Sequence, residues 1–151
     1  MIFLLIKIKA VENKIQQVQI AQHHCLEYVL CGEYRKDLEQ QITTFIEKYK
    51  EGVSCEIPSC DLKEVPLFSR QVLKALTQIP FGQTMTYGEC AHLLGHPKAA
   101  RAVGGACRRN PIPFFIPCHR LIGQKDLGGF SQGLPLKEKL LSFETHLSFN
   151  P

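Results

Sequence analysis

Acidic residues are missing from one long stretch of the 151-residue chain: none occurs between Cys90 and Lys125. The same stretch holds six basic residues, which are Lys98, Arg101, Arg108, Arg109, Arg120 and Lys125. Residues 61–151 carry eleven Lys/Arg against six Asp/Glu, whereas residues 1–60 carry seven against eight. A stretch of one sign suits a polyanion such as a nucleic-acid backbone, and a solvated basic surface is the alternative.

The chain also lacks a long apolar run and a Cys-x-x-Cys pair. The apolar opening run 1–6 is too short to span a bilayer, and neither a basic stretch nor a small-residue cleavage site flanks it. Seven cysteines are an odd number, and a chain of this size with 44% apolar residues can bury a core without disulfides. We therefore expect reduced thiols, no membrane partner and a cytoplasmic protein, or a nuclear one if the source is eukaryotic.

Hydrophobic patterning divides the chain near residue 60. The runs 2–11 and 18–20 alternate between apolar and polar residues, which predicts paired strands, and apolar residues recur at helical spacing over 38–49. A linker rich in proline and charge follows. We therefore predict an α/β (α+β) fold, with a small sheet-plus-helix domain at 1–60 and a mainly helical domain at 61–151.

A helix-turn-helix is expected in the second domain, after an amphipathic helix over 68–79. Thr86 and Glu89 fit a capping box that opens a short helix, and Gly95 closes it. A second helix over 98–109 follows this tight turn.

The helix 98–109 has few large side chains. Alanines and glycines leave Arg101 as its only long side chain before Arg108, and each interior glycine costs about 1 kcal/mol relative to alanine. Close approach of the helix backbone to a second surface would offset that cost. The second surface would be either another helix or the minor groove of DNA. The basic charge favours the second interpretation.

A short buried strand at 114–116 is predicted to deliver Cys118 at its end. A thiol is only weakly ionised at neutral pH, so reactivity requires a base. His119 is adjacent, but neighbours in an extended chain point apart, so it would act across a bend or through a bridging water. Glu144 lies in the apolar stripe of a last helix, where a lone carboxylate is costly, and it could orient His119.

These residues carry a family resemblance. The segment 98–111 with Asn110-Pro111, followed by Ile116-Pro117-Cys118-His119-Arg120, resembles the O6-alkylguanine-DNA alkyltransferases, also called methylated-DNA–protein-cysteine methyltransferases. The likeness covers about residues 62–145. By resemblance, residues 1–60 would be the variable N-terminal domain, a remnant of an RNase H-like fold.

The resemblance implies DNA repair by irreversible, single-use transfer of an alkyl group from O6-alkylguanine, and from O4-methylthymine, to Cys118. His119 would deprotonate Cys118 through water, and Glu144 would hold His119. Asn110 would fix the turn behind the second helix, and Tyr87 would protonate the departing guanine. The base must leave the duplex to be reached.

The DNA partner would be double-stranded and contacted in its minor groove by a monomer. Arg101 would fill the gap left by the flipped nucleotide, and Ser131 would bind the guanine oxygen. Further DNA or substrate contacts are expected at Ser69, Ala99, Ala100, Cys107, Arg108 and Lys137.

The chain departs from the family pattern at Phe130 and Gln132 in the pocket loop, and at Lys139, where an aromatic residue is common. The N-terminal His23, His24, Cys25, Cys31, Cys55 and Cys60 fit no standard zinc spacing, so we expect no metal and no cofactor. The alternatives are a protein that binds alkylated DNA without repairing it, and a thiol hydrolase. The presence of Cys118 argues against the first, and the basic helix-turn-helix argues against the second.

Overall fold

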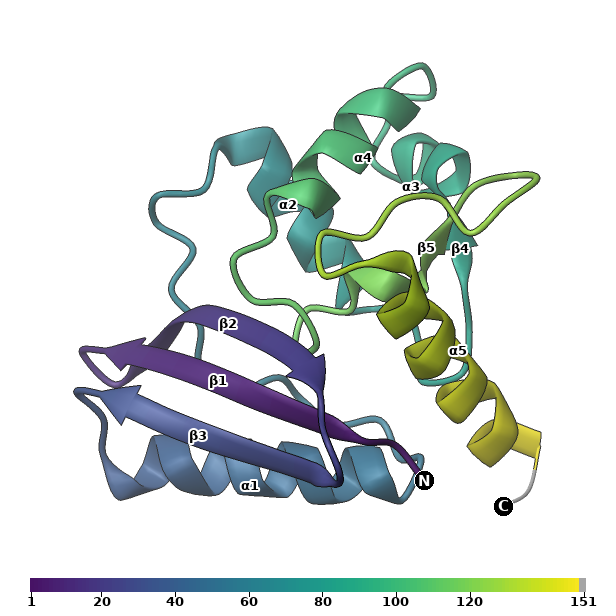
Figure 1. The fold of residues 1–151 in the computed structure, drawn as a ribbon. Helices are drawn as coiled ribbons and strands as arrows, with labels where there is room; N and C mark the ends of the chain where they lie inside the picture. The colour runs from purple at the N-terminus through teal and green to yellow at the C-terminus, as the bar shows by residue number, and fades with distance from the viewer. Residues whose placement is uncertain (150–151) are drawn as a thin grey trace.

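The computed structural model describes residues 1–149, which fold as a small sheet with one helix followed by a mainly helical region (Figure 1). The elements of the first part are β1 (Leu4–Val11), β2 (Lys14–Gln22), β3 (Leu26–Gly32) and α1 (Lys36–Lys50). Those of the second part are α2 (Leu67–Leu76), β4 (Met85–Thr86), α3 (Tyr87–Leu93), α4 (Ala100–Arg108), a 3-10 turn (Cys118–Arg120), β5 (Leu121–Ile122) and α5 (Leu134–Phe149). The α+β class is confirmed. No helix within 1–149 is long and apolar enough to cross a membrane.

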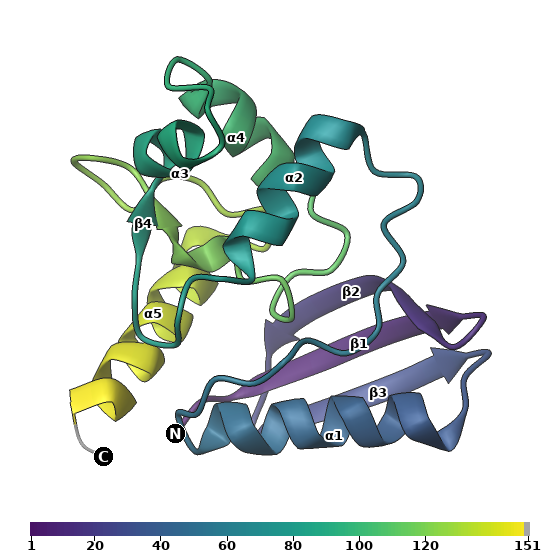
Figure 2. The same ribbon diagram turned by 180° about the vertical axis from the view of Figure 1, so that it is seen from behind.

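The N-terminal sheet has the strand order β2-β1-β3, with β1 antiparallel to β2 and parallel to β3. Alternate residues of β1 are buried and the intervening lysines are exposed, as a strand covered on one face requires. Helix α1 runs along the sheet in both views (Figures 1 and 2), and its buried stripe includes Leu38, Ile42 and Tyr49. Burial of these two apolar faces against each other forms the N-terminal half of the core.

The helix-turn-helix consists of α3 and α4. The Thr86 side chain accepts a hydrogen bond from the Glu89 amide, and the Glu89 carboxylate accepts one from the Thr86 amide, so the predicted capping box is confirmed. Gly95 lies in the turn after α3 with φ +77°, a left-handed conformation that glycine adopts without a steric penalty. Helix α4 packs against both α2 and α3, with Val103 and Ala106 completely buried.

The predicted strand at 114–116 was wrong. Phe114 has φ +78°, and the Ile116 amide donates to the Ile112 carbonyl at 3.0 Å, so this segment is a tight turn. Apolar runs of this length do not distinguish a buried strand from a buried turn. A short strand does exist nearby, but it is β5, which follows Cys118 and pairs in parallel with β4.

The outer edge of β2 is joined to the rest of the molecule at several points. Ile15 forms two backbone hydrogen bonds with the segment predicted as a linker, and the Val18 amide donates to the Pro111 carbonyl at 2.8 Å. Farther along, the Ile20 amide donates to Gln132 Oε1 at 3.4 Å, and Lys139 Nζ donates to Gln22 Oε1 at 2.9 Å. Gln132 and Lys139, two departures from the family pattern, therefore connect the C-terminal elements to the sheet.

We expect Gln132→Ala to loosen the loop at 128–133, because its side chain accepts a hydrogen bond from β2. A bond of this kind contributes about 1 kcal/mol, so local amide exchange in the loop should accelerate about fivefold. Hydrogen-exchange mass spectrometry measures this directly. The control is Gln124→Ala, an exposed position whose side chain has no hydrogen bond within residues 1–149. Equal exchange in the two variants would contradict the proposed attachment.

Candidate active site

Cys118 begins the 3-10 turn and its side chain is buried. Asn110 Nδ2 lies 3.1 Å from its sulfur and donates a hydrogen bond to it. Burial raises the pKa of the Cys118 thiol, while the Asn110 bond and the positive charge of Lys137 oppose that rise. The resting residue is therefore a protected thiol that needs a base to react.

Asn110 holds the turn that connects α4 to Cys118. Its Nδ2 also donates to the Ile116 carbonyl at 3.0 Å, and its Oδ1 accepts from the Ile112 amide at 3.0 Å. One amide side chain thus bonds both sides of the turn and the sulfur, which is the position predicted for a hinge residue. An alanine here would leave these buried groups without partners.

His119 and Glu144 form a buried pair. His119 Nε2 and Glu144 Oε1 are 2.7 Å apart, and the two side chains are 0% and 1% exposed. Burial disfavours the ionised form of Glu144, but the His119 ring and the Arg120 guanidinium outweigh this effect and lower the carboxyl pKa to about 2. Because an ionised carboxylate only accepts hydrogen bonds, the proton between the two groups belongs to Nε2.

The other ring nitrogen of His119 is the one available for proton transfer. Nδ1 is buried and has no hydrogen-bond partner within the described residues. In a neutral imidazole with a proton on Nε2, Nδ1 carries the free lone pair. No direct Cys118–His119 hydrogen bond occurs in residues 1–149, and the water expected to link them stays a prediction.

Two further side-chain partners of Glu144 were not anticipated from the sequence. Arg120 donates from Nε to Oε2 at 2.8 Å and from Nη2 to Oε1 at 3.1 Å, and the Tyr49 hydroxyl donates to Oε1 at 3.0 Å. Arg120 had been counted in the basic stretch, but it is 8% exposed and serves the interior. Tyr49 had been assigned only to the apolar stripe of its helix. No local pattern signals a bond that joins residues 95 positions apart.

A hollow of about 1020 Å³ opens over Cys118. Its wall is formed by one side of α4, the start of α3 and the loop before α5. The predicted site residues that line it are Tyr87, Ala100, Arg101, Cys107, Arg108, Cys118 and Ser131. Gly104, Gly105, Gly129 and Phe130 complete this wall, so the small residues of α4 border the cavity as well as pack in the core.

The loop before α5 is fastened to α3 beside this hollow. The Tyr87 hydroxyl donates to the Gly129 carbonyl at 3.3 Å, and burial raises the pKa of Tyr87 to about 12. Gly128 has φ +65°, and a Cβ there would lie 2.5 Å from the Tyr87 ring. A larger residue at 128 would therefore displace either the loop or the tyrosine.

Lys137 is completely buried beneath the same loop. Its ammonium donates to the Leu121 and Gly129 carbonyls and lies 5.9 Å from the centre of the Tyr87 ring. Burial lowers the pKa of Lys137. This residue was expected to contact DNA or substrate, and the structure places it inside the wall of the site.

Two other predicted contacts lie outside the hollow. Ser69 is buried on α2 and borders a separate hollow of about 420 Å³ together with Arg109. Ala99, half-buried before α4, does not line the hollow over Cys118 among the described residues. Lys98, Arg101, Arg108 and Arg109 are all exposed, so the basic surface does occur on and around α4.

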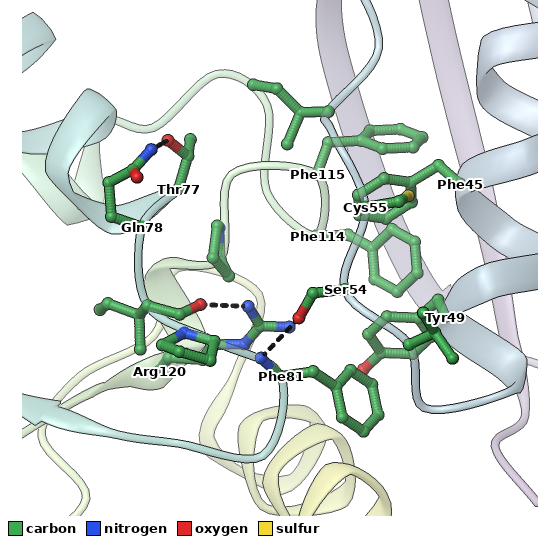
Figure 3. Close-up of a pocket in the computed structure, with 15 residues that line it drawn as sticks. Phe45, Tyr49, Ser54, Cys55, Thr77, Gln78, Phe81, Phe114, Phe115 and Arg120 are labelled. Atoms are coloured by element: carbon green, nitrogen blue, oxygen red, sulfur yellow. Dashed lines mark hydrogen bonds between the residues drawn. The ribbon is translucent and has the colours of Figure 1, made fainter.

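A smaller hollow, of about 200 Å³, is lined by Tyr49 and Arg120, two residues that hydrogen-bond Glu144 (Figure 3). It is bordered by α1, by the segment after α1 and by the turn before Cys118. Figure 3 shows Phe45 and Tyr49 of α1 facing Phe81, Phe114 and Arg120. The aromatic contacts between the two parts of the chain therefore lie directly against the residues that hold Glu144.

The N-terminal residues considered as zinc ligands are only partly brought together. Within residues 1–149, His23 and Cys25 meet Glu27, with their ligating atoms inside 4.8 Å of one another. Cys25 Sγ donates to Glu27 Oε1 at 2.9 Å. The remaining candidates do not join this group among the described residues, so the absence of a metal stays a prediction.

We expect Glu144→Gln to change how the stability of the fold depends on pH. The folded pKa of Glu144 lies near 2, below its ordinary value of about 4.5, so its contribution to stability is complete above about pH 4.5 and is lost as the pH falls toward 2. At neutral pH the variant should lose about 3 kcal/mol, because Arg120 and His119 lose a buried charged partner.

Urea unfolding at several pH values measures this difference. Wild type and variant should converge as the pH is lowered, whereas Glu138→Gln, which changes an exposed carboxylate on the same helix, should leave the pH dependence unaltered. A constant difference between wild type and Glu144→Gln at all pH values would contradict the assignment.

Comparisons of the sequence with known proteins repeatedly find one family. Residues 67–146 match the family model described as 6-O-methylguanine DNA methyltransferase, DNA binding domain. The chain is 37% identical over 144 residues to a probable methylated-DNA–protein-cysteine methyltransferase of Acanthamoeba polyphaga mimivirus, covering 91% of this chain and 96% of that protein. It is 48% identical over 103 residues to the methylated-DNA–protein-cysteine methyltransferase of Methanosarcina acetivorans, covering 66% and 64%.

Solved structures of related proteins have a fold similar to that of this chain. The crystal structure of Mycobacterium tuberculosis OGT in complex with DNA superposes with a TM-score of 0.75 and 29% identity, covering 93% of this chain and 86% of that one. The O6-methylguanine DNA methyltransferase of Methanococcus jannaschii superposes with a TM-score of 0.64 and 30% identity, covering 93% and 87%. The likeness therefore extends across the N-terminal sheet as well as the helical region.

Proposed function

The chain belongs to the 6-O-methylguanine DNA methyltransferase family and repairs DNA by alkyl transfer, and from that premise we propose that Cys118 is the residue that accepts the alkyl group. The observation that carries this proposal is the position of Cys118. Its thiol lines the hollow beside α4, receives a bond from Asn110, and is followed directly by the buried His119–Glu144 pair.

The proposed reaction is a displacement at the alkyl carbon. His119 Nδ1 takes the proton of the Cys118 thiol through an intervening water, and the charge of Glu144 stabilises the resulting imidazolium. The thiolate forms a bond to the alkyl carbon as the bond between that carbon and guanine O6 breaks. The electron pair remains on the base, which takes up a proton and leaves as guanine. Tyr87, whose hydroxyl is protonated at neutral pH, is the proposed donor of that proton.

The product explains why each molecule acts once. Alkylated Cys118 is a thioether, which offers no good leaving group for a reverse step. The reaction is therefore stoichiometric and irreversible, and it uses no cofactor. We propose O6-alkylguanine as the principal substrate and O4-methylthymine as a second one, because both present an alkyl group on an exocyclic oxygen.

The mode of DNA binding follows from the surface of α4. The small residues along the hollow, Ala100, Gly104 and Gly105, suit close approach to the narrow minor groove. The target base would enter the hollow over Cys118, because the reacting carbon lies inside an intact duplex. Arg101 is exposed at the rim and is the proposed occupant of the gap left in the base stack, while Ser131 would bind the flipped base.

We also propose that the chain acts as a monomer. It would act in the compartment that holds the DNA, which is the cytoplasm, or the nucleus if the source is a eukaryote. Residues 1–60 would form a supporting domain, and residues 61–151 the domain that binds DNA and accepts the alkyl group.

Mixing the protein with an oligonucleotide duplex that contains O6-methylguanine should add the mass of one methylene group to each molecule. Peptide mapping by mass spectrometry should locate the group on Cys118. Cys107→Ser serves as the control, because Cys107 is a second buried thiol in the wall of the same hollow and should not be needed as an acceptor. Binding of the duplex without any mass change would leave only the alternative of a damage-binding protein.

Arg101→Ala should impair repair of duplex DNA more than alkylation by free O6-benzylguanine, because its proposed role is to support the flipped state. A flipping contribution of about 1.4 kcal/mol corresponds to about a tenfold slower reaction with duplex. Rate constants for both substrates should be compared with those of Lys125→Ala, which removes an exposed charge from the same acid-free stretch. Equal losses with both substrates would rule out the role given to Arg101.

A further inference from the structure

The N-terminal part of the chain contributes directly to the buried pair beside Cys118. Tyr49, in the last turns of α1, places its hydroxyl 3.0 Å from Glu144 Oε1, the same oxygen that accepts from His119 Nε2. The tyrosine is 2% exposed and the carboxylate 1%. A donor from outside the DNA-binding region therefore completes the hydrogen bonding of the carboxylate that pairs with His119.

The ring of Tyr49 is fixed by aromatic packing. Phe81, Phe114 and Phe143 lie with their ring centres 5.2, 4.6 and 5.5 Å from it, and all three belong to the second part of the chain. Figure 3 shows Phe81 and Phe114 on either side of Tyr49. A ring held by three neighbours cannot rotate its hydroxyl away, so the bond to Glu144 is set by the packing of α1 against the turn before Cys118.

The charged and titratable groups bonded to Glu144 are His119, Arg120 and Tyr49. Arg120 contacts both carboxylate oxygens, and the Gly82 amide donates to Oε2 at 3.3 Å. Burial and the neighbouring carboxylate raise the pKa of Tyr49 well above its ordinary value, so the phenol remains a donor throughout the neutral range. Its bond withdraws charge from the oxygen that faces His119.

We propose that Tyr49 is a positioning residue for the alkyl transfer, holding Glu144 Oε1 against His119 and moderating how strongly that oxygen retains the His119 proton. This inference rests on the proposed function of Cys118 and His119. Loss of the hydroxyl would concentrate negative charge on Oε1 and favour the protonated ring. Since the base must be neutral to take the proton of Cys118, the rate would then fall at higher pH than in the wild type.

The test is Tyr49→Phe, which keeps the packed ring and removes only the donor. Rate constants for transfer from an O6-methylguanine duplex are measured across the acid and neutral range. We expect the acid limb of the profile to move up by about half a pH unit, so that the rate on that limb falls by up to about threefold, as for loss of a bond to a buried charge. An unchanged midpoint would overturn the proposal, even if the variant were less stable.

The matched control is Tyr28→Phe. Its hydroxyl also makes one hydrogen bond, to Thr43 Oγ1 at 2.9 Å, in the same N-terminal part but away from Glu144. This variant should keep the wild-type midpoint.

If Tyr49→Phe fails to fold, a ring-fluorinated tyrosine at position 49 retains the donor and makes it more acidic. The acid limb should then move to lower pH, and no movement would count against the proposal.

A second measurement separates this inference from the proposed function. Alkylation of Cys118 by iodoacetamide needs neither DNA nor base flipping, and its pH profile in the same variants reports on proton removal alone. If the wild type transferred no methyl group, the proposed function would fail, while a shifted iodoacetamide profile in Tyr49→Phe would still support the role of Tyr49. An unshifted profile beside normal methyl transfer in the wild type would overturn the role of Tyr49 alone.

Discussion

The carboxylate of Glu144 is buried and ionised, and a protein interior tolerates such a group only when it is paired and fully hydrogen-bonded. Its partners come from separate parts of the chain: Tyr49 from α1, the Gly82 amide from the turn after α2, and His119 and Arg120 from the 3-10 turn. Satisfying this one charge therefore brings α1, α2, α5 and the reactive turn together. The geometry at Cys118 depends on all of them, because His119 is oriented by the same carboxylate.

A division of roles follows from this arrangement. Helix α4 and the loop at 128–133 form the open side of the site. Small residues and exposed basic side chains on this side suit DNA. The closed side is formed by buried residues, including Asn110, which donates a hydrogen bond to the sulfur, and Lys137 beneath the loop. The reactive thiol lies between these two sides, with its pKa raised by burial until a base acts on it. Such a thiol reacts slowly until its proton is removed, and the hollow is the side from which the substrate would reach it.

Much of this site was predictable from the sequence, because its signals are local. Helical periodicity located α1, α2 and α5, the Thr86–Glu89 capping box located the start of α3, and a carboxylate in an apolar stripe singled out Glu144. The turn at 114–116 was not predictable, because a buried turn and a buried strand share the same apolar composition. Arg120 and Tyr49 were missed for a different reason, because their roles come from contacts across the fold. From the sequence, Arg120 is interpreted as a basic surface residue and Tyr49 as an aromatic residue of the core.

The covered edge of β2 has a consequence for the behaviour of the protein in concentrated solution. An unpaired strand edge is a template on which other chains can add strands, and this is a common route to aggregation. In this sheet the segment after α1, the Pro111 carbonyl and the Gln132 side chain occupy that edge along most of its length. The outer edge of β3 is then more open to foreign strands. The strand itself carries Glu27, and Glu33 directly follows its end; these charges discourage such pairing. The contacts that attach the pocket loop to the sheet thus also act against self-association.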